Sequence, residues 1–224
     1  MRCIFLSLSF WIISQSLFAQ HYPDSLPALL PRLSLKFSPL HLINFYPSIQ
    51  LSSEYQVSPK TTLQTGLGYV FDNSFGDERF QNKRGIKARQ EIRRYYDLYH
   101  KSDQAYYFSL ELYLNAVNFN RSEWRTECFD LDCNILFNRR YNYVVRYREH
   151  GLSIRNGFIK YLSANIFIDL AFGATLRFID YRKPNLPPAF NEDEFWGWFI
   201  EIPNERKRTS LAPALTCKLA YRFK

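Results

Sequence analysis

The sequence predicts an all-β fold, an eight-stranded antiparallel transmembrane β-barrel. Three observations predict it: segments of about ten residues with alternating apolar and polar side chains, connections that are alternately short and long, and a chain end on aromatic residues. Alternation with a period of two is typical of strands, and strands of about ten residues are long enough to cross a membrane. Aromatic residues make up 18% of the chain, which favours strands that meet a membrane–water interface.

The last of these segments, 211–223, carries the alternation to the end of the chain. Leu211 and Leu215 belong to a largely apolar face, whereas Thr216 and Lys218 belong to a small or polar face. A strand of a membrane barrel points one face at lipid and the other at the lumen. This segment therefore predicts the last strand of such a barrel.

The N-terminus has the three parts of a secretory signal peptide. Arg2 supplies a basic start, residues 4–18 form an apolar core, and Ala19 precedes a plausible cleavage point. The proline-rich stretch that follows has no alternation and predicts a periplasmic lead-in. The expected divisions are a signal peptide at 1–19, a periplasmic lead-in at 20–31 and an outer-membrane β-barrel at 32–224.

Seven further segments show strand periodicity. The clearest is the fifth, in which Phe108, Leu110 and Leu112 alternate with Ser109 and Glu111. Pro39 predicts that the first strand ends or bends there, because proline cannot donate to a strand ladder. The expected strands are 33–40, 48–57, 61–71, 86–97, 106–116, a sixth that starts between 141 and 151 and ends near 162, and 166–178.

The connections differ in length in a regular way. Short turns follow the second, fourth and sixth strands, whereas long connections at 72–85, 121–140 and 180–206 follow the third, fifth and seventh. Outer-membrane barrels have short periplasmic turns and long extracellular loops. A soluble periplasmic ligand-binding barrel is the alternative, but its apolar faces would point inward and it has no reason for alternating connection lengths.

Charged side chains fall on the faces expected to point inward. An eight-stranded barrel is just wide enough to be filled by its own side chains, and an unpaired charge away from water is costly. We therefore expect ion pairs to plug the lumen, in preference to a conducting pore. The residues expected in this lumen charge network are Glu54, Arg89, Glu91, Arg93, Glu111, Asp169 and Arg177, with Arg89, Glu91, Arg93 and Glu111 at its centre.

The formal net charge of +8 raises the question of nucleic-acid binding. The basic run 206–208 lies just before the last strand and is expected to be a loop, while the other basic residues are spread over the strands. A solvated loop, or one that contacts lipopolysaccharide phosphates, fits this distribution better than a nucleic-acid surface. We expect no nucleic-acid partner.

Two long connections contain other candidate sites. Cys128 and Cys133 are spaced for a small loop disulfide in an oxidising compartment, although the spacing leaves their pairing open and offers too few ligands for a metal. Trp196 and Trp198 lie beside acidic residues in the last connection. They either anchor a partner or glycan, or pack on the barrel rim as part of an aromatic girdle.

The chain combines a signal peptide, eight alternating strands, short turns and an end at Tyr221 and Phe223. In this combination it resembles the small outer-membrane barrels of Gram-negative envelopes, of the OmpA-barrel and OmpX kind. The resemblance implies location in the cell outer membrane and a structural or surface-interaction role without a cofactor. The partners expected on this basis are outer-membrane lipid, lipopolysaccharide and the barrel-assembly machinery, with the barrel itself monomeric.

An enzyme is the competing class, since outer-membrane lipid A-modifying enzymes have a similar architecture. Such an enzyme would need a histidine, a serine and an acid close together. Glu149, His150 and Ser153 lie on one expected strand, but only residues an even number apart share a face. His150 and Ser153 are therefore expected on opposite faces, and we expect no catalytic residues.

Overall fold

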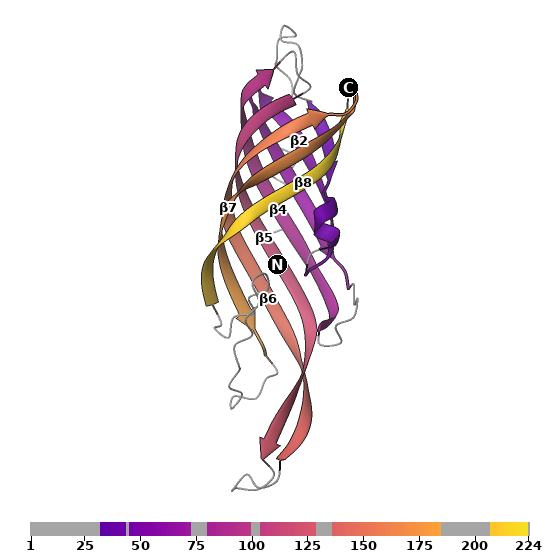
Figure 1. Cartoon of the computed structure of the whole chain (residues 1–224), viewed down its shortest axis with the longest axis vertical. Helices are drawn as coiled ribbons and strands as arrows, with labels where there is room; N and C mark the ends of the chain where they lie inside the picture. The colour runs from indigo at the N-terminus through magenta and orange to yellow at the C-terminus, as the bar shows by residue number, and fades with distance from the viewer. Residues whose placement is uncertain are drawn as a thin grey trace, which may run out of the picture.

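Eight antiparallel strands close into a barrel in the computed structural model of the chain (Figure 1). Each strand pairs with the next, and β8 pairs with β1, so the predicted all-β fold class and strand number are confirmed. The structure describes residues 32–43, 45–72, 80–99, 104–128, 136–184 and 207–223. The strands are β1 (Leu33–Phe37), β2 (Ser48–Ser58), β3 (Thr61–Val70), β4 (Phe80–Tyr99), β5 (Gln104–Cys128), β6 (Leu136–Tyr161), β7 (Ile166–Arg182) and β8 (Lys207–Phe223).

Three connections were expected to be longer than they are. Residues 80–85 belong to β4, most of 121–140 extends β5 and β6 as a hairpin, and residues 207–208 of the expected basic loop begin β8. The hairpin projects from the lower end of the barrel in Figure 1. These predictions were wrong for two reasons. In β4 a bulge between Gln81 and Arg84 interrupts the alternation. In the hairpin the side chains of residues 136–140 are exposed on both faces, so the sequence there has no reason to alternate.

Many charged and polar residues are buried inside the barrel, and apolar residues cover the outside. Lys36, Glu54 and Asp169 are fully buried, whereas Leu112 is 60% exposed and Leu215 is 73% exposed. Inward-facing residues of soluble barrels are mostly apolar, so this arrangement is inverted. No helix in the described ranges is long and apolar enough to cross a membrane.

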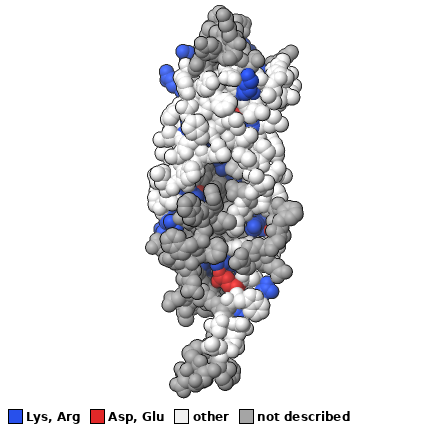
Figure 2. Space-filling view, in the orientation of Figure 1, with Lys and Arg blue, Asp and Glu red and all other residues white. Residues whose placement is uncertain are grey.

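The exposed apolar side chains form a belt that ends at basic residues. On β4, Ile86 and Ile92 face outward between Arg84 and Arg94, and both arginines are exposed. The two arginines are about ten residues apart, the length of a tilted strand that crosses a bilayer. Figure 2 shows a largely uncharged band below the upper end of the molecule. We call this outward surface the apolar belt.

Two clusters of apolar side chains occupy the lumen. The short-turn cluster lies toward the end where β8 finishes, and the long-loop cluster lies toward the opposite end. Ionic side chains lie between the two. The short-turn cluster consists of Tyr95, Ala105, Tyr107, Ile159, Phe167, Ala171 and Ala220, and the long-loop cluster of Val70, Phe80, Val117, Phe119, Tyr143, Val145, Tyr147, Ile179 and Tyr181.

The ladder that closes the barrel is short. β1 pairs with β8 only from Leu33↔Phe223 to Phe37↔Leu219, although β8 continues along β7 as far as Lys207. Pro39 then begins the 3-10 helix η2 (Pro39–Leu42), which confirms the expected end of the first strand. Beyond this point η2 lies beside β8 in place of a strand, and we call this part of the wall the seam.

The apolar belt predicts how substitutions on β5 affect stability in lipid. Leu112→Arg places a charge in the middle of the belt and should lower the unfolding free energy by about 2–4 kcal/mol. Asn118→Arg, at the exposed margin of the same strand, should cost only about 0–1 kcal/mol. Urea titration of the protein refolded into lipid vesicles measures both values, and equal costs would contradict a membrane-facing belt.

Candidate functional site

Asp169 of β7 is the centre of a buried ionic network in the lumen. It accepts hydrogen bonds from Lys36 Nζ at 2.6 Å, Arg93 Nη1 at 2.6 Å and Tyr107 Oη at 2.5 Å. These side chains come from β1, β4 and β5, so one carboxylate ties together strands from different parts of the wall. Charge-assisted hydrogen bonds of this kind are about twice as strong as neutral ones.

Glu54 of β2 and Lys218 of β8 extend this network to two further strands. Glu54 pairs with Lys36 at 2.5 Å, while Arg93 donates to Glu91 at 3.0 Å and Lys218 donates to it at 3.2 Å. Three cations therefore face three carboxylates. We call this set, Lys36, Glu54, Glu91, Arg93, Asp169 and Lys218, the Asp169 network.

Glycines make room for the tyrosines that reach this network and its neighbour. A Cβ at Gly157 would lie 2.4 Å from the ring of Tyr107, and one at Gly151 would lie 2.7 Å from the hydroxyl of Tyr113. No larger residue fits these positions without displacing a ring. The glycines thereby allow the hydroxyls of the two tyrosines to reach Asp169 and Glu149.

A second and a third ionic group lie toward the long loops. Glu111 pairs with Arg155 and with Arg89 Nη1 at 3.2 Å. Glu149 accepts from Arg177 Nε at 2.7 Å and also from the side chains of three neighbours. These neighbours are Tyr113 at 2.9 Å, Asn115 at 3.0 Å and Tyr147 at 2.8 Å.

The structure distributes the expected lumen residues over these three groups. Every residue of the expected charge network points inward, but its expected centre is divided: Glu91 and Arg93 lie with Asp169, while Glu111 and Arg89 lie with Arg155. The expected set omitted four partners. Lys36, Arg155 and Lys218 lie on inward faces by alternation, whereas Glu149 belongs to the sixth strand, whose start the sequence left open.

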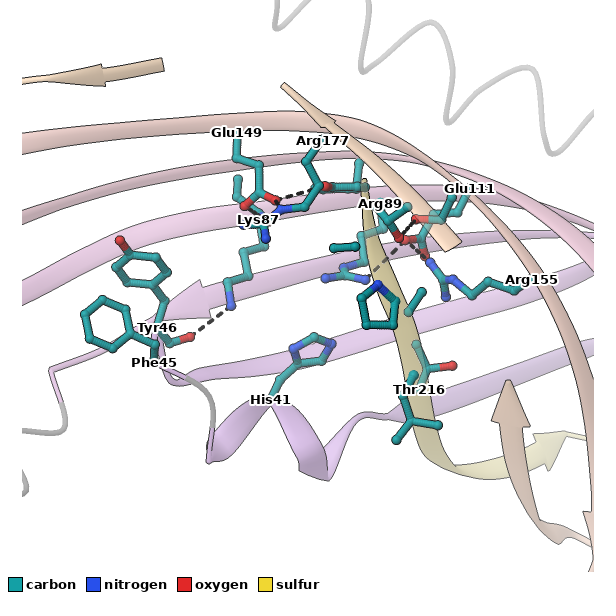
Figure 3. Close-up of a pocket in the computed structure, with 18 of the residues that line it drawn as sticks. His41, Phe45, Tyr46, Lys87, Arg89, Glu111, Glu149, Arg155, Arg177 and Thr216 are labelled. Carbon is teal, nitrogen blue, oxygen red and sulfur yellow. Dashed lines mark hydrogen bonds and ion pairs between the residues drawn. The ribbon is translucent and has the colours of Figure 1, made fainter. Parts of the chain in front are cut away.

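A cavity of about 270 Å³ adjoins the second and third groups (Figure 3). Lys87, Arg89, Arg155 and Arg177 line it, against the carboxylates of only two residues, Glu111 and Glu149. Lys87 also donates to the carbonyl oxygen of Tyr46 at 2.9 Å. On the opposite side, η2 and the residues after it meet β8, so the cavity adjoins the seam. Its lining there consists of His41, Phe45, Tyr46, Ala212, Pro213, Ala214, Leu215 and Thr216.

Comparisons with known proteins give a likeness among solved structures. No protein-family model matches the chain, and no curated protein matches it. Among solved structures, the chain is similar to the N-terminal β-barrel domain of Pseudomonas aeruginosa OprF, with 10% sequence identity and a TM-score of 0.37. The match covers 85% of this chain and 95% of that chain. An identity of 10% limits this likeness to the fold.

The candidate catalytic set does not assemble. His150 is exposed on the outer face, where it stacks on Phe178 at 5.3 Å, whereas Ser153 is buried in the lumen and lies 2.7 Å from the hydroxyl of Thr175. This separation agrees with the expectation from alternation. Among the described side chains, no group of three or more His, Cys, Asp or Glu residues is placed to hold a metal ion.

The other candidate residues of the long connections lie outside the described part of the structure. This holds for Cys133, Trp196, Trp198 and the side chain of Cys128, and likewise for the expected signal peptide and lead-in. The disulfide and the aromatic binding surface therefore stay predictions from the sequence.

The Asp169 network predicts that removing a buried ion pair lowers the unfolding free energy much more than removing an exposed one. Asp169→Asn leaves Lys36 and Arg93 without a balancing charge, so it should lower the unfolding free energy by about 3–5 kcal/mol. Arg182→Gln removes a pair whose arginine is 53% exposed, and should change the unfolding free energy far less, because solvent screens such a pair. Chemical unfolding in detergent micelles compares the two, and a cost below 1 kcal/mol for Asp169→Asn would contradict the network's role in stability.

Proposed function

We propose that this protein is an outer-membrane β-barrel with a structural or surface-interaction role and no enzymatic activity. In this proposal a signal peptide at 1–19 directs export, the barrel-assembly machinery inserts the chain, and the short turns face the periplasm. The observation that carries the proposal is the inverted distribution of side chains, charged inside and apolar outside.

The apolar belt supports a membrane location over the soluble periplasmic barrel. Soluble monomers rarely expose contiguous apolar patches larger than a few hundred Å². Here outward-facing leucines and aromatic residues such as Leu67, Phe172 and Leu215 are all more than half exposed. Lipid removes these side chains from water, which is favourable by about 25 cal/mol per Å² of apolar surface.

The lumen contents support a barrel that does not conduct. Apolar clusters occupy both ends of the lumen, and the Asp169 network lies between them. A barrel of eight strands leaves little space beyond its own side chains. In this proposal the ion pairs stabilise the barrel and do not line a path for ions.

The partners proposed are the lipids of the outer membrane. The apolar belt would contact acyl chains, and basic residues at its margin on the long-loop side would lie near lipopolysaccharide phosphates. Arg84 and Arg148 are exposed there, which supports such contacts. The barrel is proposed to act as a monomer, because its sheet is closed and offers little free strand edge.

Cell fractionation tests the location. The full chain should sediment with the outer membrane and migrate faster on a detergent gel before heating than after heating, because a folded barrel stays compact in detergent. Recovery in the soluble periplasmic fraction, with no mobility shift, would contradict the proposal and favour a soluble ligand-binding barrel.

Planar bilayers test the closed lumen. Insertion of the purified protein should add no stable conductance steps, because apolar side chains occupy both ends of the lumen. A double variant, Tyr107→Ala with Phe167→Ala, removes two large side chains from the short-turn cluster and should raise the frequency of current events. Uniform ohmic steps from the unaltered protein would show a pore and overturn this part of the proposal.

A further inference from the structure

The seam connects the lumen cavity with the outer surface of the barrel. Pro213 and Leu215 have the outward register of β8 and are exposed, and Leu215 is 73% exposed, yet both line the cavity together with the inward-facing Ala214. Proline has no amide hydrogen, so Pro213 suits a strand edge without a ladder partner. Figure 2 shows the surface hollowed at mid-length, with charged atoms visible inside the hollow. The cavity therefore opens through the wall within the apolar belt.

The cavity has an excess of positive charge. Lys87, Arg89, Arg155 and Arg177 outnumber its carboxylates by two, unlike the balanced Asp169 network. Arg155 is buried, with only 1% of its side chain exposed, and it shares the single carboxylate of Glu111 with Arg89. Cations away from water need counter-charges, so the arrangement favours an anion in the cavity.

Several buried polar atoms around the cavity lack hydrogen-bond partners within the described structure. The donors are Nε and Nη1 of Arg155 and Nε of Arg89, and the hydroxyl of Thr216 is unpaired in the same way. The unpaired acceptors include Oε2 of Glu111 and Oδ1 of Asn115. These atoms have almost no accessible surface, so they reach a ligand only when their side chains turn toward the cavity. Guanidinium donors then fit the oxygens of a phosphate, and the acceptors fit hydroxyl groups carried beside it.

The cavity is large enough for a lipid headgroup but too small for a whole lipid. Ligand pockets usually enclose about 300–1,000 Å³, and this cavity of about 270 Å³ lies just below that range. Its opening is lined by small or apolar residues, Ala212, Pro213, Ala214 and Leu215, which suit the start of an acyl chain. A phosphate headgroup would match the charged interior of the cavity, and acyl chains in the surrounding bilayer would match its apolar opening.

We propose that this cavity binds the phosphate-bearing, hydroxylated headgroup of a membrane lipid, which reaches it sideways through the seam between η2 and β8. Arg155 and Arg89 bind the phosphate, Lys87 and Arg177 add to the positive field, and Glu111 and Asn115 accept from headgroup hydroxyls. The inference rests on the proposed membrane location of the barrel. It adds a specific lipid site to a protein proposed above only to be surrounded by lipid.

Native mass spectrometry of the full chain in detergent tests the proposal with phosphatidylglycerol as the probe and phosphatidylcholine as the comparison lipid. The protein should retain one phosphatidylglycerol in preference to phosphatidylcholine. The double variant Glu111→Gln with Arg155→Gln removes the Glu111–Arg155 ion pair and keeps the net charge of the cavity, while Arg89 loses its carboxylate partner. It should weaken phosphatidylglycerol retention about tenfold or more, since hydrogen bonds to charged groups are lost.

Two further variants separate the site from general effects. Arg94→Gln removes the same charge from the outer face of β4, far from the cavity, and should leave retention within about twofold of the unaltered protein. Ala214→Phe fills the opening and should weaken retention of the lipid. Equal retention of the two lipids by the unaltered protein, or retention unchanged in the Glu111→Gln, Arg155→Gln variant, would overturn the proposal.

Inorganic phosphate distinguishes the source of the anion. A lipid site should keep phosphatidylglycerol in the presence of millimolar phosphate, whereas a site for free phosphate would bind that ion alone and show no preference between the lipids, which would overturn lipid binding. Each variant is first checked for the heat-dependent mobility of a folded barrel. Failure of that check in the unaltered protein counts against the membrane barrel itself, whereas a folded barrel without lipid preference counts only against the site.

Discussion

The salt bridge between Lys36 and Asp169 stabilises the barrel where its first and last strands meet. The ladder between β1 and β8 spans only the pairs from Leu33↔Phe223 to Phe37↔Leu219, and it is as short as the ladder between β1 and β2. Lys36 of β1 reaches past β8 to Asp169 of β7 at 2.6 Å, and Asp169 is also bound by Arg93 from β4. The network therefore links strands that do not pair with one another, on both sides of the closing ladder. Buried charges are costly by themselves, so such a network stabilises the barrel only because every carboxylate in it has cationic partners.

The two faces of each strand have different surroundings and therefore different side chains. The backbone of a membrane-spanning strand needs hydrogen-bond partners on both sides, which only a closed sheet supplies. In this barrel the outward side chains are largely apolar and exposed, while many inward side chains carry charge and face one another. Glycines such as Gly151 and Gly157 take part in this arrangement, because a narrow lumen accepts the rings of Tyr113 and Tyr107 only where facing residues have no side chain.

Pro39 interrupts this regular arrangement of paired strands. Pro39 cannot donate to a ladder, so β1 ends at Phe37 and η2 takes the place of a longer strand beside β8. Pro213 lies on the part of β8 that has no ladder with β1, where its missing amide hydrogen leaves nothing unpaired. The seam that results leads to the cavity with the unbalanced cations. In the sequence, Pro213 inside an otherwise regular strand indicates a strand edge without a ladder partner. It identifies the seam only once the structure places Pro39 and Pro213 on the same side of the barrel.

The sequence by itself determined the strand number and which residues of each strand point inward, because a period of two is a local property of the backbone. It therefore placed Glu54, Asp169 and Arg177 on the inner faces without knowledge of their partners. Only the tertiary structure decided which charges meet, since Lys36 and Asp169 are brought together by register and closure and not by spacing along the chain. It also decided how far β5 and β6 extend, because paired strands without a buried face have no constraint on their side chains. The tertiary structure likewise decided the cavity. Its lining comes from five of the strands, η2 and the residues that follow it, and it exists only after the barrel has closed.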